Sequence, residues 1–346
     1  MKHQTTRYGE IPFYKIGTFG NTADAFISKK LFLEYKTKYS FPKKGDILIS
    51  ASGTIGRAVI YDGKPAYFQD SNIVWIDNDE TLVKNDFLFY AYSNVKWNTE
   101  HTTILRLYND NFRNTLIPLP PLNEQSAIAN ILSGLDRYLC ALDSLIFKKE
   151  GVKKALSFEL LSQRKRLKGF NQAWQRVRLG DIANYLTSNL SAEQITQQGK
   201  IKVYDVNNFI GYTDTTFISD KPYISIVKDG SVGRVRILPP KTNILSTMGA
   251  LIANHRTTTE FLFYLLSNFD FKNFTSGSII PHIYFKDYKE KTIFLPPLNE
   301  QSAIANILSG LDNEIASLKN KKRQFENIKK ALNHDLMSAK IRVLKK

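Results

Sequence analysis

The chain has 346 residues, of which 42% are hydrophobic and 12% aromatic, and its formal net charge is +16. It is long enough to bury two sizeable cores and too apolar to be disordered. Because no run of about 18 apolar residues is present and the opening MKHQTTRYGEIPF has no apolar signal-peptide core, we expect a cytoplasmic protein that does not enter a membrane.

The first region alternates short strand-like runs with glycine turns. β-Branched segments at residues 42–50, 53–62 and 72–77 predict strands. The octet FLFYAYSN at residues 87–94 predicts a helix that follows them. Pro120-Pro121 cannot lie inside a helix or a central strand, so we expect this mixed region to end there in an extended piece.

An exact internal repeat follows. The stretch LPPLNEQSAIANILSGLD occupies residues 119–136 and again residues 295–312, while its flanks differ. Perfect identity beside divergent flanks indicates two half-molecules that share one connector. We expect the repeated part to be scaffold and the divergent parts to carry specificity.

Each repeat predicts the start of a long helix. Asn123 and Asn299 stand where an N-cap would, and each precedes a glutamate that suits a helix N-terminus. Leucine and isoleucine then recur at alternating spacings of four and three residues, which is typical of a coiled-coil seam. The seam positions are Ile128, Leu132, Leu135, Leu139, Leu142 and Ile146 in the first copy, and Ile304, Leu308, Leu311, Ile315 and Leu318 in the second.

Helix length gives this pattern a meaning. A helix over residues 124–168 would span about 65 to 70 Å, comparable to about two turns of duplex DNA at ~34 to 36 Å each. Gly151 is expected to fray or bend it. Two equivalent helices most simply pair with each other; packing on a partner subunit or on the chain's own globular regions is the alternative.

The second divergent region shows the same succession of predicted strands, glycine turn and helix as the first. Residues 221–238 predict two strands around a glycine turn, and residues 241–253 a further strand. The octet FLFYLLSN at residues 261–268 differs from its earlier counterpart at two positions, which indicates homologous folds. The predicted domains are residues 1–121, 122–170, 171–297 and 298–346.

The basic charge is concentrated after the repeats. Residues 147–170 carry a net charge of +6 and residues 319–346 a net charge of +8, so the globular regions are near neutral. A charge run is usually a solvated face. Two such runs at equivalent places equally favour a nearby polyanion.

Motifs for catalysis are absent. The sequence has no glycine-rich methyl-donor loop, no Asn-Pro-Pro-aromatic motif for a flipped adenine and no P-loop. One cysteine and five scattered histidines give no zinc spacing. The turn at residues 52–56 lacks the lysine of a phosphate loop, and Cys140 is predicted to be a small apolar filler. We therefore expect no catalytic residues, no metal and no cofactor in this chain.

These features together resemble the specificity subunit of a type I restriction-modification system, over essentially the whole chain. The motifs are SGTIGR and DGSVGR between strands, the FLFY helices, LPPLNEQ and the long Leu/Ile helices, all present twice. The resemblance implies an α/β (α+β) fold, with two homologous target-recognition domains joined by two long antiparallel coiled-coil helices. Each domain would read one half of a split double-stranded DNA site, and the helices would act as the spacer.

The resemblance also implies partners. Modification (methyltransferase) subunits would bind alongside the helices, and they would carry S-adenosylmethionine and methylate adenine. Whether restriction subunits join stays open. One departure from the family pattern is that WQRVRLGDI at residues 174–182, which resembles the usual domain start, has no equivalent before residue 11. A late translation start, a trimmed sequence or a gene rearrangement would each explain this, and it puts full DNA binding by the first domain in question.

Side chains that match base edges belong on the loops of such domains. The candidates are Ser52, Thr54, Arg57, Gln69, Asn72, Arg106 and Tyr108 in the first domain, and Ser231, Arg234, Arg236, Thr247, Ser276, Ser278, His282 and Tyr284 in the second. Phosphate contacts are expected from Lys43, Lys44, Lys228 and Lys286. Two other hypotheses remain: a coiled-coil assembly scaffold without DNA reading, and an autonomous DNA-modifying enzyme, which the missing motifs disfavour.

Overall fold

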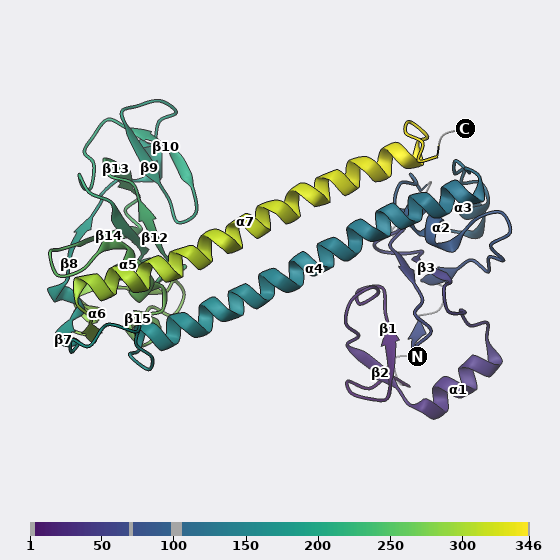
Figure 1. Ribbon diagram of the computed structural model, residues 1–346, viewed down its shortest axis with the longest axis horizontal. Coiled ribbons are helices and arrows are strands. Elements are labelled where there is room, and N and C mark those ends of the chain that lie inside the picture. Colours follow the sequence, from purple (N-terminus) through teal and green to yellow (C-terminus); the bar gives the residue numbers. More distant parts are fainter. Residues whose placement is uncertain (1–3, 69–71, 98–105, 345–346) are drawn as a thin grey trace. The chain divides into compact units, whose positions relative to one another are not determined.

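The computed structural model describes residues 4–68, 72–97 and 106–344 (Figure 1). The chain forms two compact units: unit 1 is Met1–Asp143 with Asn320–Lys346, and unit 2 is Ser144–Lys319. Both long repeat helices therefore contribute one part to each unit. None of the helices in the described ranges combines the length and the apolar character that a membrane span requires.

The described residues of unit 1 form two small sheets and three short helices, besides the parts of the long repeat helices. The first sheet has the order β2-β1-β5, with β1 (Ile11–Tyr14) antiparallel to β2 (Ala25–Ile27) and parallel to β5 (Tyr67–Phe68). The second has the order β4-β3-β6, with β3 (Ile47–Ser50) antiparallel to both β4 (Ala58–Ile60) and β6 (Ile73–Trp75). The helices are α1 (Lys29–Lys38), α2 (Asn85–Tyr92) and α3 (Asn109–Arg113).

Strand β3 is the centre of unit 1 because it is apolar on both faces. All four of its residues are buried. Ile47 and Ile49 pack against Leu88 and Tyr92 of α2, and Leu48 packs in a separate cluster on the other face. A strand covered on both sides reads as a continuous apolar run, which is why the ILIS segment predicted a strand.

Unit 2 repeats this arrangement and adds strands to it. One sheet has the order β10-β9-β13, formed by β9 (Ile201–Tyr204), β10 (Phe209–Thr213) and β13 (Thr242–Ile244). Another has the order β12-β11-β14-β8, formed by β11 (Tyr223–Val227), β12 (Val235–Leu238), β14 (Met248–Ala253) and β8 (Ala183–Thr187). Two-stranded pairs join β7 (Gln175–Arg178) to β17 (Thr292–Leu295) and β15 (Thr275–Ser276) to β16 (His282–Ile283).

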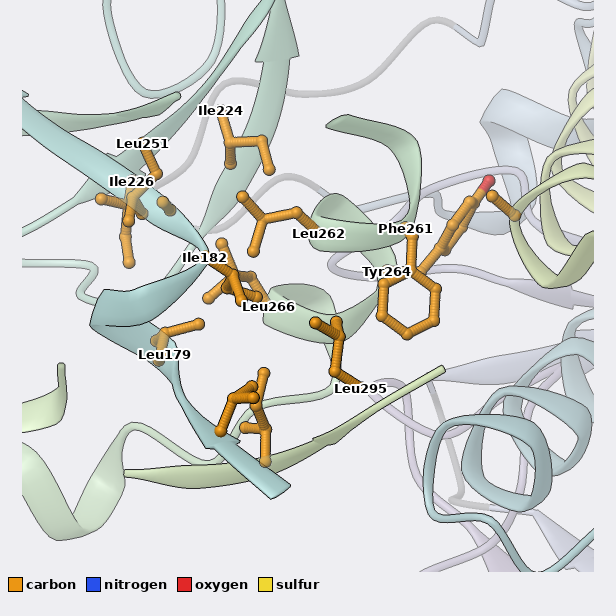
Figure 2. Packing of buried hydrophobic residues seen from close by; sticks show 14 of the residues in the cluster. Leu179, Ile182, Ile224, Ile226, Leu251, Phe261, Leu262, Tyr264, Leu266 and Leu295 are labelled. Atoms are coloured by element: carbon orange, nitrogen blue, oxygen red, sulfur yellow. The ribbon is translucent and has the colours of Figure 1, made fainter. Parts of the chain in front are cut away.

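The helix α5 (Thr259–Ser267) covers the central sheet of unit 2, as α2 covers that of unit 1. Its Leu262 and Leu266 point toward Ile224 and Ile182 in the core (Figure 2). The short helix α6 (Phe285–Tyr288) corresponds to α3. Strand order and strand direction agree between the two units for the three strands of each sheet that they share, which confirms the predicted homologous folds.

The repeat helices are α4 (Leu122–Leu161) and α7 (Leu298–Met337), each 40 residues long. Each starts earlier than predicted, because the Gln125 N–H already bonds to the Pro121 carbonyl at 2.9 Å and Gln301 repeats this contact with Pro297. Asn123 and Asn299 therefore lie inside the first turn, where each side-chain Oδ1 accepts from the next N–H. The predicted N-cap position was wrong.

The helices also end earlier than predicted, at Leu161 rather than residue 168 in the first copy. Two residues beyond each helix, Gln163 and Ala339 adopt left-handed backbone conformations with φ of 63° and 56°. Such a residue turns the chain off the helix axis. Gly151 does not interrupt α4, contrary to the prediction.

Within each unit, α4 and α7 pair antiparallel. In unit 1, Asp143 pairs with Lys322 and Asp136 with Lys329. Residue numbers therefore rise along α4 in the direction in which they fall along α7. In unit 2, Lys149 pairs with Glu314 and Lys153 with Asp312 in the same opposed sense. The seam residues Leu132 and Leu308 are fully buried, which confirms the coiled-coil prediction. Cys140 is exposed, so its prediction as a core filler was wrong.

Candidate functional site

Two equivalent glycine turns stand at the ends of the central strands. Turn 1 (residues 52–56) follows β3, and turn 2 (residues 229–233) follows β11. Gly56 and Gly233 have φ of 80° and 78°. A Cβ at Gly56 would lie 2.3 Å from Nε1 of Trp97, and at Gly233 it would lie 2.6 Å from the Phe271 ring. Glycine is needed at both places because the backbone is left-handed and an aromatic ring packs directly against it.

In unit 2, a hairpin is fastened to turn 2. The His282 Nδ1 and Asp229 Oδ1 atoms are 2.6 Å apart, and the Gly230 N–H donates to the Pro281 carbonyl at 2.9 Å. The Ile283 N–H donates to the Lys228 carbonyl at 2.9 Å. These contacts hold the β15–β16 hairpin at the end of the central sheet.

Most of the predicted unit 2 residues gather at this end. The Tyr284 ring is exposed and stacks near His282, with the Lys286 ammonium 5.6 Å from its centroid. The Lys228 N–H donates to the Thr247 carbonyl at 3.1 Å. We call this group edge cluster 2; its members are Lys228, Ser231, Thr247, Ser276, Ser278, His282, Tyr284 and Lys286.

Arg234 and Arg236 lie beside this cluster and reach the neighbouring sheet. Arg234 Nη2 donates to the Asn207 Oδ1 at 2.8 Å, and Arg236 Nη1 donates to the Asn207 carbonyl at 2.9 Å. Arg236 also lies over the Tyr204 ring, 5.3 Å from its centroid. Both guanidinium groups are thus held by the β9–β10 turn.

Unit 1 builds the same end with different side chains. Ser52 forms an isolated antiparallel β-bridge with Arg106 through the backbone, as Asp229 does with His282. The Leu107 N–H donates to the Ala51 carbonyl, and the Ala51 N–H donates to the Asn72 carbonyl, both at 2.8 Å. We call this group edge cluster 1; its members are Ser52, Thr54, Asn72, Arg106 and Tyr108.

Backbone contacts make the two clusters equivalent, position by position. The pairs are Thr54 and Ser231, Arg57 and Arg234, Asn72 and Thr247, Arg106 and His282, and Tyr108 and Tyr284. Arg57 Nη1 donates to the Phe19 carbonyl at 3.0 Å, so it also reaches the neighbouring sheet. Gln69 lies outside the described residues.

Two predicted phosphate-binding residues lie elsewhere. Lys43 and Lys44 precede β3, at the end opposite to turn 1. Lys43 Nζ pairs with Asp77 at 3.1 Å, and the Lys44 side chain packs beside Gly63. The structure does not bring these lysines together with edge cluster 1.

Several residues of this region were not singled out from the sequence. Asp229 and Asn207 position His282 and the two arginines, and the aspartate of DGSVGR was an available signal for the first of these. Ile279, at the tip of the β15–β16 hairpin, is 92% exposed. No pattern in the sequence marks it, because an isolated isoleucine in a loop has no periodicity.

The repeated sequence itself supplies contacts from the helices to each globular region. In unit 1, Gln125 accepts from the Lys84 N–H at 2.8 Å and donates to the Leu82 carbonyl at 3.0 Å. In unit 2, Gln301 accepts from the Thr258 N–H at 3.1 Å and donates to the Arg256 carbonyl at 2.9 Å. Because these bonds go to backbone, one glutamine serves two divergent partners.

A tyrosine, an aspartate and a lysine form a second repeated contact. Tyr90 donates to Asp136 at 2.8 Å, and Lys329 pairs with the same carboxylate while lying 5.7 Å from the Tyr90 ring centroid. Tyr264 donates to Asp312 at 2.9 Å in the same way. Burial, and then the neighbouring carboxylate, raises the pKa of both tyrosines above the usual range. Both hydroxyls therefore remain donors at neutral pH.

An arginine on the partner segment closes each helix N-terminus. Arg342 Nη2 binds Glu124 Oε2 at 2.5 Å, and Arg166 Nη2 binds Glu300 Oε2 at 2.6 Å. The hydrogen bonds from Arg342 hold the pKa of Glu124 below its usual value. In unit 2 the indole of Trp174 also donates to Glu300, at 2.9 Å.

The described residues contain no group of three or more His, Cys, Asp or Glu that could hold a metal ion. Edge cluster 1 presents hydroxyl, amide and guanidinium groups beside the exposed ring of Tyr108, and edge cluster 2 presents hydroxyl, imidazole and ammonium groups beside the exposed ring of Tyr284. Such groups form hydrogen bonds with base edges and phosphates. The arrangement suits recognition through hydrogen bonds.

Comparisons with known proteins agree with this internal duplication. The model for the type I restriction modification DNA specificity domain matches residues 1–146 and again residues 171–327. A Haemophilus influenzae protein named as a type I restriction enzyme specificity subunit is 65% identical over 133 residues, covering 38% of this chain and 34% of that protein. The chain thus spans about a third of that relative's length.

Two further proteins are similar over most of the chain. A Methanocaldococcus jannaschii protein named as the MjaX specificity subunit of a type I restriction enzyme is 28% identical over 335 residues, covering 86% of this chain and 79% of that protein. The solved structure of a type I restriction-modification S subunit from M. genitalium is 21% identical, with a TM-score of 0.64. That match covers 97% of this chain and 91% of the other, and it shows that the fold is shared.

Proposed function

Because the chain belongs to the family of type I restriction-modification DNA specificity subunits, we propose that its two units each read one half of a bipartite DNA site. The observation that carries this proposal is the duplicated edge cluster. Equivalent backbone contacts place residues at equivalent positions around turn 1 and turn 2, but the residue types at most of these positions differ. The same backbone arrangement carrying two different sets of hydrogen-bonding groups suits the recognition of two different half-sites.

Direct base reading would come from the exposed members of each cluster. Arg106 and His282 occupy equivalent positions and differ in donor pattern, because a guanidinium presents a fork of N–H groups and an imidazole at most two. Tyr108 and Tyr284 are exposed beside them. Lys228 and Lys286 are placed to neutralise phosphates, which positions a protein without specifying sequence.

We assign the spacer and docking roles to α4 and α7. Each helix of 40 residues corresponds to about 60 Å. The equivalent positions Ile131 and Ile307 are both exposed on the helices, as are Val152 and Ile328. Unit 1 therefore presents Ile131 of the repeat with Ile328 of the pairing helix, and unit 2 presents Ile307 with Val152 at the equivalent positions. A pair of identical methyltransferase subunits, one for each repeat, suits such a duplication. Methyl transfer and S-adenosylmethionine binding are assigned to those partners.

DNA binding with the partner present tests the proposal. We expect the chain with its methyltransferase subunit to bind target duplex with an affinity that falls steeply as salt rises, because phosphate neutralisation releases counterions. The matched comparison is Tyr284→Ala against Tyr39→Ala, since Tyr39 is exposed at the end of α1 and belongs to neither cluster. Only the first should reduce target binding. Complex assembly without any DNA affinity would instead support the assembly scaffold.

A further inference from the structure

A carboxylate and an imidazole form a pair at the base of the β15–β16 hairpin. His282 Nδ1 and Asp229 Oδ1 are 2.6 Å apart, and the two residues also form an isolated antiparallel bridge through the backbone. The His282 side chain is 35% exposed and that of Asp229 is 29% exposed. The pair is therefore held by two separate contacts and keeps part of its surface in contact with solvent.

Two further neighbours limit the orientation of the imidazole ring. The Tyr284 ring lies nearly parallel to it, at an interplanar angle of 19° and with the centroids 6.4 Å apart. A Cβ added to Gly277 would lie 3.0 Å from His282 Cδ2, so the glycine lies against that edge of the ring. A half-turn of the ring would place Cδ2 against the carboxylate in place of Nδ1. The hydrogen bond to Asp229 would then be lost.

The carboxylate decides which ring nitrogen carries the proton. An ionised carboxylate can only accept, whereas a neutral imidazole has one donor nitrogen and one acceptor nitrogen. The contact with Asp229 therefore places the proton on Nδ1 and leaves Nε2 as an acceptor. In the described part of the chain, this contact is the only hydrogen bond of the ring. Because Nε2 is not among the buried polar atoms without a partner, it keeps accessible surface.

The hairpin that carries His282 has the form of a two-stranded β-ribbon, which the major groove of B-DNA can admit. Ser276, which lies opposite His282 in this ladder, is exposed. In that groove the exocyclic amino groups, N6 of adenine and N4 of cytosine, are donors, whereas guanine and thymine present acceptors. An acceptor at Nε2 therefore fits adenine or cytosine and is opposed by guanine O6 or thymine O4.

We propose that Asp229 is a positioning residue that fixes His282 Nε2 as a hydrogen-bond acceptor, and that His282 thereby selects a base with an exocyclic amino group in the half-site of unit 2. This inference rests on the proposed function, because it takes unit 2 to read one half-site. The counterpart of His282 in unit 1 is Arg106, whose guanidinium can only donate. The selection of an amino group is therefore specific to the half-site of unit 2.

Base analogues that lack one amino group test the proposal with the full chain and its methyltransferase partner. The target comes from the methylation map, and the half-site of unit 2 is the one that relaxes in His282→Ala. Each adenine of that half-site is replaced in turn by purine, and each cytosine by 2-pyrimidinone, at about pH 8, where a free imidazole is neutral. At one position we expect the replacement to weaken binding by the wild-type complex about tenfold more than by the His282→Ala complex. The weaker base pairing of the analogue is common to both complexes and cancels.

A substitution at Asp229 tests the positioning role. An amide at this position can donate to Nδ1 as well as accept from it, so it no longer fixes the proton on Nδ1. Asp229→Asn should therefore shrink the penalty of the analogue at that one position. Reading of the other bases and amide hydrogen exchange of β15–β16 should stay unchanged, whereas a merely structural role would alter both. Asp287→Asn is the matched control, because it removes the same charge from an exposed residue of α6.

Three results would overturn the proposal. One is a preference of the wild-type complex for guanine at the position that His282 reads, because Nε2 would then be a donor. Another is an analogue penalty that is equal in the wild-type and His282→Ala complexes at every position, and the third is a penalty that Asp229→Asn leaves unchanged. Failure of the wild-type complex to bind any DNA sequence specifically would contradict the proposed function itself, and this inference with it.

Discussion

Replacing Leu132 by alanine should destabilise unit 1 and leave unit 2 intact. Leu132 is 0% exposed and packs with Phe87, Tyr90 and Leu336. The substitution removes three buried carbon atoms, which at about 0.8 kcal/mol per CH₂ gives a transfer cost of about 2.4 kcal/mol. The cavity left behind adds to this, so we expect a total loss of about 3 to 4 kcal/mol.

Leu308 is the same residue of the second repeat copy and is also 0% exposed, but it packs in the core of unit 2. Leu308→Ala should therefore cause a similar loss in the other unit. Ile131→Ala and Ile307→Ala are the matched controls, since these neighbours are 39% and 37% exposed. Exposed substitutions of this kind usually change stability by about 0.5 kcal/mol or less.

Native-state hydrogen exchange locates these losses. Leu132→Ala should lower protection in β3 and α2, and Leu308→Ala in β11 and α5. A loss from Leu132→Ala that spreads equally to β11, or one below about 1 kcal/mol, would refute the reasoning, because it would mean that the repeat is not a separate core element of each unit.

Three further predictions concern the helix contacts and the clusters. Arg342 holds the pKa of Glu124 below its usual value. The stabilisation from this carboxylate is therefore present above its unfolded-state pKa and is lost as pH falls through its folded pKa. In urea unfolding, the difference in free energy of unfolding between wild type and Glu124→Gln should shrink below about pH 5, and a difference that stays constant with pH would contradict this. Tyr90→Phe should cost about 1.5 to 3 kcal/mol through loss of the bond to Asp136, while Tyr8→Phe, at an exposed tyrosine, should be neutral in the same unfolding assay. Arg106→Ala should weaken target binding by about 1 to 3 kcal/mol without changing the free energy of unfolding; an equal loss on unrelated duplexes would assign Arg106 to phosphate contact.

Local sequence patterns predicted the long helices and the glycine turns of the fold. The spacing of Ile128, Leu132 and Leu135 specifies a helix seam without any knowledge of the partner helix, because the periodicity lies within a few turns. The two glycine turns could also be predicted, because a left-handed backbone of the kind found at Gly56 and Gly233 favours glycine. The structure has a glycine turn at residues 52–56 and another at residues 229–233, in the two regions where the sequence predicted them.

Contacts between distant residues could not be predicted in this way. Asp229 and His282 are 53 residues apart, and nothing in the local pattern of either residue points to the other. Cys140 shows a different limit: it follows the seam residue Leu139 directly, and one residue is about 100° around a helix, so a position next to the seam faces outward. The exact repeat marked Gln125 as important, but only the backbone contacts show that it holds the globular region to the helix.

The most direct test of the central claim is a map of methylated adenines in DNA from cells that express this chain with its methyltransferase partner, compared with the same map for His282→Ala. We predict a wild-type motif with two specified halves and an unspecified spacer. The substitution should relax one half and leave the other unchanged, because His282 belongs to edge cluster 2 alone. A contiguous motif, or equal relaxation of both halves, would contradict the assignment of one half-site to each unit.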